Sequence, residues 1–161
     1  SWNKFFAGVS TTVLHLPIHR NRNSIVPETL RAKSLRLFQL LRRLEEADDN
    51  GYCECVTCGE VRHYSTVHGG HFLPKGKSSF WAHSPDNVFP QCPACNLYGM
   101  KHGSAAQVYT IFMIRKFGQA KVDQMISTQK QAIKIYAQEY REMIANYNER
   151  IKVEKKRIGV L

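Results

Sequence analysis

The chain has 161 residues, of which 43% are hydrophobic, so it can form a core and wholesale disorder is excluded. Lys and Arg number 23 against 13 Asp and Glu, which gives a net charge of +10. This excess favours a polyanionic partner such as nucleic acid, although a basic protein without such a partner has the same balance. No apolar run approaches the roughly 18 residues of a membrane span, and residues 2–13 are too interrupted for a signal peptide. We therefore expect a cytoplasmic protein without a membrane partner.

The N-terminal quarter divides into an arm and a helix. Residues 1–26 lack periodicity, and we interpret them as an irregular basic arm that packs on the domain, contacts DNA or is a loosely docked terminus. A helix is predicted from Pro27 to the Asn50–Gly51 turn, because leucines recur at helical spacing. Its apolar stripe is expected in the core. Its basic face is either a plain solvated face or a track for DNA phosphates, with the candidate DNA-binding residues Arg36, Arg42 and Arg43.

A strand, a loop, a second strand and a helix are predicted in order within residues 52–103. Val61–Val67 suits a short strand, and His71 ends a strand after two glycines that allow a sharp turn or close approach to a ligand. The following loop is polar and basic. A second strand is predicted at Asn87–Phe89, and Pro93 begins a helix that carries Cys95 and Asn96. Further candidate DNA-binding residues in this region are Lys75, Lys77 and Lys101.

Three helices are predicted after this region. They cover Ala105–Phe117 with Ser104 as N-cap, about Ala120–Ile126, and about Thr128–Arg157. Apolar residues of the last helix alternate by four and three, as in a heptad seam. This seam packs on its own domain or pairs with a second copy, so a homodimer is a possible state. The expected organisation is an arm at 1–26, a domain at 27–126 and a long helix within 127–161.

Two Cys-x-x-Cys pairs predict one zinc site. A two-residue gap lets both sulfurs of a pair reach one ion, and four thiolates leave no open position for water. The zinc is therefore expected to be structural, with ligands Cys55, Cys58, Cys92 and Cys95. Cys53 is interpreted as a spectator thiol, with the role of alternative ligand less favoured.

His71 is the candidate general base, although any single histidine is more often structural. A neutral imidazole can take a proton from water that attacks a phosphodiester, and an amide or carbonyl near Asn87 can orient the ring. Such chemistry also needs a divalent cation, and oxygen and imidazole ligands suit Mg²⁺ or Mn²⁺. The candidate ligands of this second metal are His68 and Asn96, with His102 in reserve; a surface role for His68 is equally open.

The combined motifs resemble a known class of enzymes. Cys-x-x-Cys, Gly70-His71-Phe72, Asp86-Asn87-Val88 and Gln91-Cys92-x-x-Cys95-Asn96 are similar to HNH endonucleases, the ββα-metal or His-Me finger class. More narrowly, residues of about 35–126 resemble the phage NinG (Rap) recombination nucleases. The resemblance implies a metal-dependent nuclease that prefers branched DNA, such as displacement loops and Holliday junctions. It matches His71 to the catalytic base, Asn87 to the central Asn and Asn96 to the last residue of HNH.

Several positions depart from the family pattern. Gly70 stands where many HNH enzymes have an acid or His, and His68 stands where NinG-like chains have an Asp. Ala82-His83 replaces a usual Arg-Phe pair, Phe89 replaces a His and Ser104 replaces an Asn. These changes affect the expected ligands of the catalytic metal more than the expected fold.

We therefore predict an α+β protein: a zinc-stapled ββα-metal core, a basic helix before it, and helices after it that include one long helix. The predicted function is structure-selective DNA cleavage, with Lys and Arg holding backbone phosphates. One alternative is a zinc-stapled DNA-binding module of a phage recombination system without turnover. Another is a phage accessory protein that acts on a host protein through its long helix.

Overall fold

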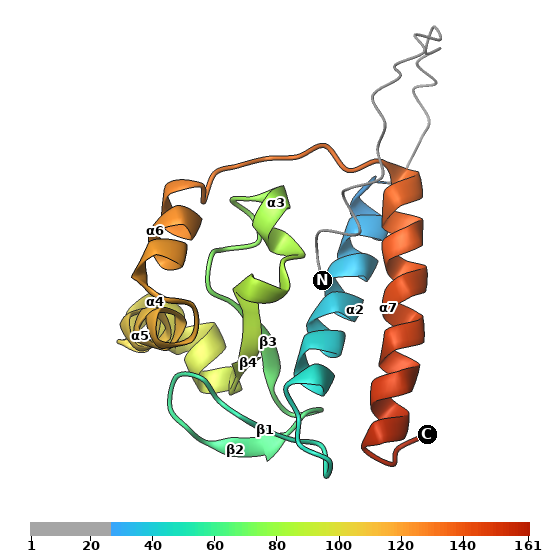
Figure 1. Cartoon of the computed structure of the whole chain (residues 1–161), viewed down its shortest axis with the longest axis horizontal. Helices are drawn as coiled ribbons and strands as arrows, with labels where there is room; N and C mark the ends of the chain where they lie inside the picture. Colours follow the sequence, from blue (N-terminus) through green and yellow to red (C-terminus); the bar gives the residue numbers. More distant parts are fainter. Residues whose placement is uncertain (1–26) are drawn as a thin grey trace, which may run out of the picture.

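The computed structural model describes residues 27–161, and the predicted arm at 1–26 lies outside this range. Its helices and two small antiparallel sheets make the architecture α+β, as predicted. Figure 1 shows a pair of long helices on one side, short strands in the middle and shorter helices on the other side. Within the described range, every helix is too short or too polar to cross a membrane.

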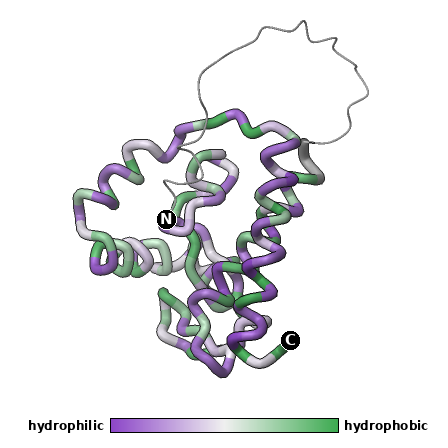
Figure 2. Tube along the Cα trace, turned by 45° about the vertical axis from the view of Figure 1, so that its right-hand side comes forward, coloured by the Kyte–Doolittle hydropathy of each residue, from purple (hydrophilic) through white to green (hydrophobic). Residues whose placement is uncertain are grey.

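The long helices α2 (Pro27–Glu45) and α7 (Ala137–Arg157) lie side by side and run in the same direction. The order of their contacts shows this, since Phe38 packs on Tyr147 and, further along both helices, Glu45 pairs with Arg150. A parallel pair needs a crossing connection. Residues 128–136 supply it by passing over the top of the molecule from α6 to α7 (Figures 1 and 2).

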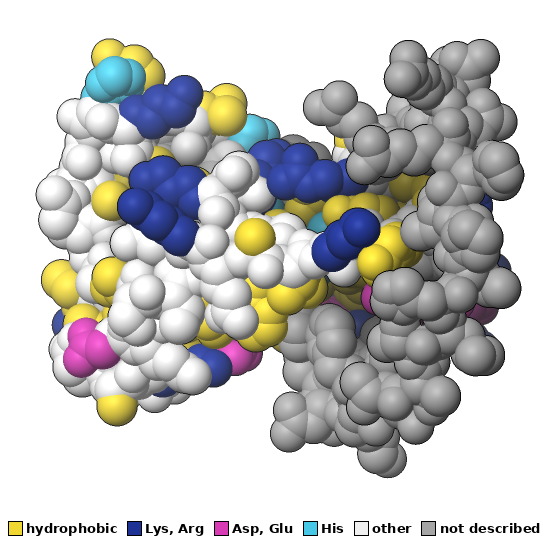
Figure 3. Space-filling model, turned by 90° about the horizontal axis from the view of Figure 1, so that it is seen from above, with side chains coloured by type: hydrophobic (Ala, Val, Ile, Leu, Met, Phe, Trp, Pro, Cys, Tyr) yellow, Lys and Arg dark blue, Asp and Glu magenta, His cyan; other side chains and the backbone are white. Residues whose placement is uncertain are grey.

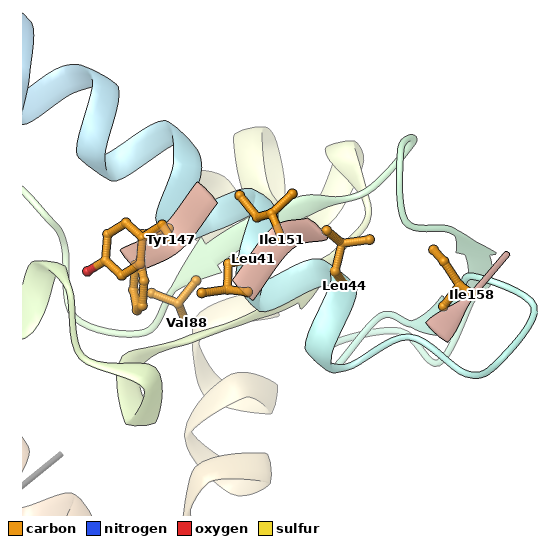
Figure 4. Close-up of a cluster of buried hydrophobic side chains, with 7 residues drawn as sticks. Leu41, Leu44, Val88, Tyr147, Ile151 and Ile158 are labelled. Carbon is orange, nitrogen blue, oxygen red and sulfur yellow. The ribbon is translucent and has the colours of Figure 1, made fainter. Parts of the chain in front are cut away.

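The apolar stripe of α2 packs against the predicted seam of α7. Leu41 and Leu44 are fully buried against Ile151 of α7, and Val88 of β4 closes the same cluster (Figure 4). Its other buried members are Phe38, Tyr147 and Ile158. The seam is therefore used within the chain, which is the first of the two alternatives drawn from its spacing. The C-terminal helix and the N-terminal helix share one core.

The start of the long helix was predicted nine residues too early. The sequence indicates Thr128, whereas α7 begins at Ala137. The reason is a set of non-local hydrogen bonds. Ser78 Oγ donates to the carbonyl of Gln131, and Ser79 Oγ donates to the carbonyl of Ile133 and accepts from its N–H. These bonds hold residues 131–136 in an extended conformation, which the helical pattern of their side chains does not indicate.

The two small sheets are both hairpins. β1 (Tyr52–Glu54) pairs with β2 (Val61–His63), and β3 (His68–His71) pairs with β4 (Val88–Gln91), in both cases antiparallel. Of the two hairpins, β3–β4 lies in the interior and β1–β2 at the bottom of the molecule in Figure 1. The second hairpin is covered on both faces. Val88 packs into the α2–α7 cluster, whereas Phe89 packs with Tyr109 and Met113 of α5 (Ala105–Phe117). Phe89 is thus a core residue at the position where the family pattern has a His.

The remaining elements follow the prediction closely. Between β3 and β4 lie α3 (Ser79–Ala82) and a 3-10 turn at Pro85–Asn87. A π-helical segment, η2 (Ala94–Gly99), continues into α4 (Met100–His102), so a helix does follow Pro93. The predicted helices at 105–117 and 120–126 are α5 and α6 (Gln119–Ser127), separated by Gly118 with φ 84°. Ser104 precedes α5, but its side chain makes no capping hydrogen bond.

Candidate metal and catalytic sites

The four predicted zinc ligands converge where the two hairpins meet. Cys55 and Cys58 lie in the turn between β1 and β2, which is closed by a hydrogen bond from the Cys55 N–H to the Glu60 carbonyl. Cys92 and Cys95 follow β4 and begin η2. The four sulfurs lie within 4.8 Å of one another. Gln91 Nε2 donates to Thr57 Oγ1 at 2.7 Å and so joins the two Cys-x-x-Cys segments a second time.

This cluster fits a metal such as zinc. A tetrahedral zinc with Zn–S bonds of about 2.3 Å places its sulfurs about 3.8 Å apart. The sulfurs of Cys58 and Cys92 are 3.8 Å apart. Cys53 lies outside the cluster: its buried thiol donates to the Arg43 carbonyl, and burial raises the pKa of this thiol to about 11. The spectator role is therefore the one the contacts support.

His71 ends β3 with one ring nitrogen held by backbone. Its Nε2 lies 2.9 Å from the carbonyl oxygen of Ala82. A carbonyl can only accept, so Nε2 carries the proton and Nδ1 keeps its lone pair. Within residues 27–161, Nδ1 has no hydrogen-bond partner. Burial lowers the pKa of His71 to about 4; the hydrogen bond to Ala82 opposes this shift, and the positive charge of Lys75 contributes to it. The ring is thus neutral at pH 7 and able to accept a proton at Nδ1.

Asn87 holds the loop that carries the Ala82 carbonyl. Its fully buried side chain accepts from the Leu73 N–H at 2.7 Å and donates to the carbonyls of Leu73 and Trp81 at 3.0 Å. All of its polar atoms are used in these contacts, and none reaches the ring of His71. Asn87 therefore positions His71 through the backbone of α3, and it is not available to contact substrate.

His83, another histidine between the two Cys pairs, directly follows Ala82, whose carbonyl contacts His71. It is 3% exposed, with the rings of Phe38, Tyr140 and Tyr147 around it. Its Nε2 lies 3.0 Å from the hydroxyl of Ser34, which itself donates to the Arg31 carbonyl. Burial lowers the pKa of His83 to about 3. The residue thus anchors the end of α3, next to Ala82, on α2. In the sequence, the only sign of this contact is Ser34, a small polar residue within the apolar stripe of α2.

The two candidate ligands of the catalytic metal, His68 and Asn96, contact each other. Nδ1 of His68 and Nδ2 of Asn96 are 2.9 Å apart. If the amide donates, Asn96 Oδ1 stays free but His68 carries its proton on Nε2. If the amide is reversed, His68 Nε2 offers a lone pair and Asn96 Oδ1 keeps only its second lone pair. While this bond persists, His68 and Asn96 therefore cannot both offer an unshared ligand atom to a cation. Burial also lowers the pKa of His68, and Arg43 adds to this effect.

The candidate residues form two separate groups. His68 and His71 lie three residues apart on β3, a spacing that places side chains on opposite faces of a regular strand. Their partners agree with this, because His68 contacts Asn96 of η2 and His71 contacts the end of α3. Within residues 27–161, no hydrogen bond joins the groups. His102 belongs to neither, since its ring packs on Tyr98 at 4.9 Å and is exposed.

Gly69 and Gly70 are explained by packing within the protein. Both lie in β3, where neither makes a turn. A Cβ on Gly69 would lie 2.9 Å from Gln39 of α2, and a Cβ on Gly70 would lie 2.0 Å from Gln91 Oε1. The hydroxyl of Tyr109 donates to the Gly70 carbonyl at 2.9 Å. The glycines therefore let β3 fit between α2 and Gln91, which differs from the turn or ligand contact expected from sequence.

The candidate DNA-binding residues divide into buried and exposed ones. Arg42 is 7% exposed, and it binds Glu45, Glu46 and the Val88 carbonyl. Arg43 is half-buried and donates to the carbonyls of Gln39, Tyr64 and Val67. These two guanidinium groups are engaged inside the fold, which leaves them little capacity for phosphate. Arg36, Lys75, Lys77 and Lys101 are exposed. The face in Figure 3 carries several Lys and Arg groups across its middle and few acidic ones.

Two small hairpins joined by a four-cysteine cluster, with a long helix pair on one side, define an α+β protein with a cluster that could hold a structural metal such as zinc. The model of the family described as Bacteriophage Lambda NinG protein matches residues 28–157. The chain therefore belongs to the NinG family of bacteriophage proteins. No curated protein and no solved structure matches the chain significantly.

Proposed function

We propose that this NinG-family protein is a metal-dependent DNA endonuclease of the HNH type that selects branched recombination intermediates, such as displacement loops and Holliday junctions. The observation that carries the proposal is the state of His71. One ring nitrogen is fixed by the Ala82 carbonyl, the other is free, and the lowered pKa keeps the ring neutral. A histidine held in this way is prepared to act as a general base.

In the proposed reaction, Nδ1 of His71 takes a proton from a water molecule as its oxygen attacks the phosphorus of a phosphodiester. The bond from phosphorus to the leaving sugar oxygen then breaks, and that oxygen takes a proton from solvent. A pKa of about 4 makes an isolated ring a weak base. A DNA phosphate next to it would raise this pKa, because the negative charge stabilises the protonated ring.

A divalent cation such as Mg²⁺ or Mn²⁺ would neutralise the charge of the reacting phosphate. Asn96 and His68 are the residues that suit such an ion, and because they form a group separate from His71, the proposal requires the DNA strand to pass from one group to the other. A single protein ligand is compatible with Mg²⁺, which often keeps waters and binds phosphate oxygens directly. The oxygen of Asn96 suits Mg²⁺ better, and the imidazole nitrogen of His68 suits Mn²⁺ better.

The exposed basic residues Arg36, Lys75, Lys77 and Lys101 suit contacts to backbone phosphates. Such contacts do not read bases, so selection would depend on DNA shape. The net charge of +10 supports this, and it implies binding that weakens as salt rises.

Cleavage of labelled branched DNA with Mg²⁺ or Mn²⁺ tests the proposal, with His71→Ala as the diagnostic variant. We expect its cleavage rate to fall by at least about 100-fold, the usual contribution of a general base, while DNA affinity in EDTA is kept. His63→Ala is the matched control, because His63 is a half-buried histidine of β2 that bonds only within its own turn. It should cut at the wild-type rate.

If wild type and His71→Ala bind branched DNA equally and neither cuts it with either ion, the endonuclease proposal is wrong and a DNA-binding module without turnover remains. If both cut equally, His71 is not the base. Zinc content and circular dichroism of each variant would show that the fold is intact, so that a loss of cleavage can be assigned to chemistry.

A further inference from the structure

The segment after the second Cys pair presents an unusual surface. Along η2 and α4, Leu97 is 61% exposed and Tyr98 is 70% exposed, and Lys101 and His102 next to them are exposed too. The rings of Tyr98 and His102 pack at 4.9 Å, tilted by 48°. We call these four residues the stacking ridge. It begins directly after Asn96, whose side chain contacts His68.

The ridge differs from other exposed apolar residues of the molecule. Within residues 27–161, large exposed hydrophobic residues otherwise occur singly, except for the last two residues of the chain. Exposed Tyr136, for example, is partly covered by the ammonium group of Lys134. Single exposed apolar residues are ordinary, but a contiguous group commonly marks a binding surface.

The ridge is also held rigidly. Cys92 and Cys95 place the beginning of η2 in the four-cysteine cluster, and the Asn96–His68 hydrogen bond joins η2 to β3. Gly99 packs so closely that a Cβ there would lie 2.9 Å from the Cβ of Ala105. A rigid surface loses little conformational entropy when a ligand covers it.

The chemistry of the ridge fits an unstacked nucleobase. The exposed ring of Tyr98 offers an aromatic platform, Leu97 before it adds exposed apolar surface, and Lys101 offers a charge for the adjoining phosphate. In duplex DNA both faces of each base are covered by neighbouring base pairs, so such a platform has nothing to stack on. At a branch point, bases lose a neighbour and one face becomes available at lower cost.

We propose that the stacking ridge binds an unpaired or unstacked base at a DNA branch point, with Tyr98 and Leu97 on the base and Lys101 on its phosphate. This inference rests on the proposed function, for which it supplies the selectivity for branched DNA over duplex. The ridge acts in binding, so it works without the chemistry of His71.

Binding measured in EDTA tests the ridge separately from cleavage. Fluorescence anisotropy would compare a four-way junction with a linear duplex of the same sequence, for wild type, Tyr98→Ala and Tyr98→Phe. We expect Tyr98→Ala to lose about 5- to 100-fold in affinity for the junction, as expected for one stacked base, and to keep its duplex affinity. Tyr98→Phe keeps the ring and should bind like wild type. Tyr136→Ala is the control, because this exposed tyrosine is the N-cap of α7, which lies on the opposite side of the molecule from α4 in Figure 1.

A 2-aminopurine placed at the branch gives a second readout. Wild type should quench its fluorescence by stacking, and Tyr98→Ala should not. If Tyr98→Ala loses equal affinity for junction and duplex, or quenches the fluorescence as wild type does, the proposal that the ridge binds a base is wrong. If no ion supports cleavage but the junction preference depends on Tyr98, the ridge stands and the nuclease proposal fails. If junctions are cut selectively by Tyr98→Ala and wild type alike, the nuclease proposal stands and the ridge fails.

Discussion

The two sides of the molecule are held together by different forces. The α2–α7 pair buries a continuous apolar cluster that includes Leu41 and Leu44. The hairpins have strands of only three or four residues, and they are joined by four sulfurs and by side-chain hydrogen bonds such as Gln91 to Thr57. Hairpins this short are not stable alone in water. The helix pair, with Val88 of β4 in its cluster, is therefore stabilised by apolar burial, whereas the turn that carries Cys55 and Cys58 depends more on the four-cysteine cluster.

Removal of the metal should have the largest effect on the structure. The loss of structure should at first be confined to the hairpin β1–β2. We expect Cys92→Ser, or dialysis against a strong chelator, to abolish protected amides in β1 and β2, whereas β3 and β4, which apolar residues cover on both faces, and the α2–α7 pair keep part of their protection. The reason is that metal binding to such a cluster is worth about 10 kcal/mol or more of folding free energy in small zinc domains. Hydrogen exchange followed by mass spectrometry would locate the loss.

The control for this experiment is Cys53→Ser, which changes a thiol outside the cluster. It should keep its metal, as measured by the thiolate charge-transfer absorption of the cobalt-substituted protein. Loss of protection spread evenly over α2, α7 and the hairpins after chelation would show that the two sides unfold as one unit and would break the comparison.

Truncation of the helix pair should give the next largest effect and should be global. Leu41 is fully buried, with 0% of its surface accessible to solvent. Leu41→Ala is expected to lower the free energy of unfolding by about 2–5 kcal/mol, through lost burial and the cavity left behind. Urea denaturation measures this. Because the cluster is untouched, the folded variant should still bind cobalt with the wild-type spectrum. A changed spectrum would mean that the scaffold shapes the metal site directly.

A smaller effect is expected where the two sides meet at β3. Gly70→Ala places a Cβ 2.0 Å from Gln91 Oε1, so Gln91 must move and its bond to Thr57 is disturbed. We expect a loss of about 1–3 kcal/mol, as for other overpacked interiors. Gly76→Ala is the matched control, since a Cβ at Gly76 meets nothing within 4 Å. Equal stability of the two variants in thermal denaturation would contradict the packing role assigned to Gly70.

The same division governs how much could be read from the sequence. The metal cluster, the order of strand, loop, strand and helix, and the helices α5 and α6 were predictable because each depends on local spacing. Cysteines two residues apart must reach one ion, and Gly118 must end a helix. The limits of α7 were not predictable, because Ser78 and Ser79 hold residues 131–136 from more than 50 positions away.

The sequence indicates candidate catalytic residues but not their contacts. Asn87 was expected to orient His71. Its side chain instead bonds to Leu73 and Trp81, and its carbonyl accepts from the Phe72 N–H. The bond between His68 and Asn96 depends on how η2 packs on β3, which residue spacing does not fix. Arg42 and Arg43 looked like a basic face, because a charge pattern does not show which side of a helix is covered by other elements.

The smallest expected effect is on the pH dependence of stability. It concerns two histidines at the junction of the helix pair and the second hairpin. His83 lies between α2 and α7, and His71 lies in the second hairpin, with Ala82 between them in sequence. Burial lowers the pKa of His71 from 6.5 to about 4 and that of His83 to about 3. Between pH 6.5 and 4 the unfolded chain therefore binds more protons than the folded protein. Stability is complete above pH 6.5 and falls as the pH is lowered through this window.

From pH 7.5 to 5.5 each of these histidines should reduce the free energy of unfolding by about 1.4 kcal/mol. His71→Asn removes one titrating ring but keeps an N–H donor for the Ala82 carbonyl, so the reduction should become about 1.4 kcal/mol smaller than in wild type. In the variant, His83 still contributes its own reduction of the free energy of unfolding. Urea denaturation at the two pH values measures the difference. An identical pH dependence in wild type and variant would mean that His71 titrates in the folded protein as it does in the unfolded chain. The free Nδ1 would then be open to water, and the site would not be the desolvated one that its burial indicates.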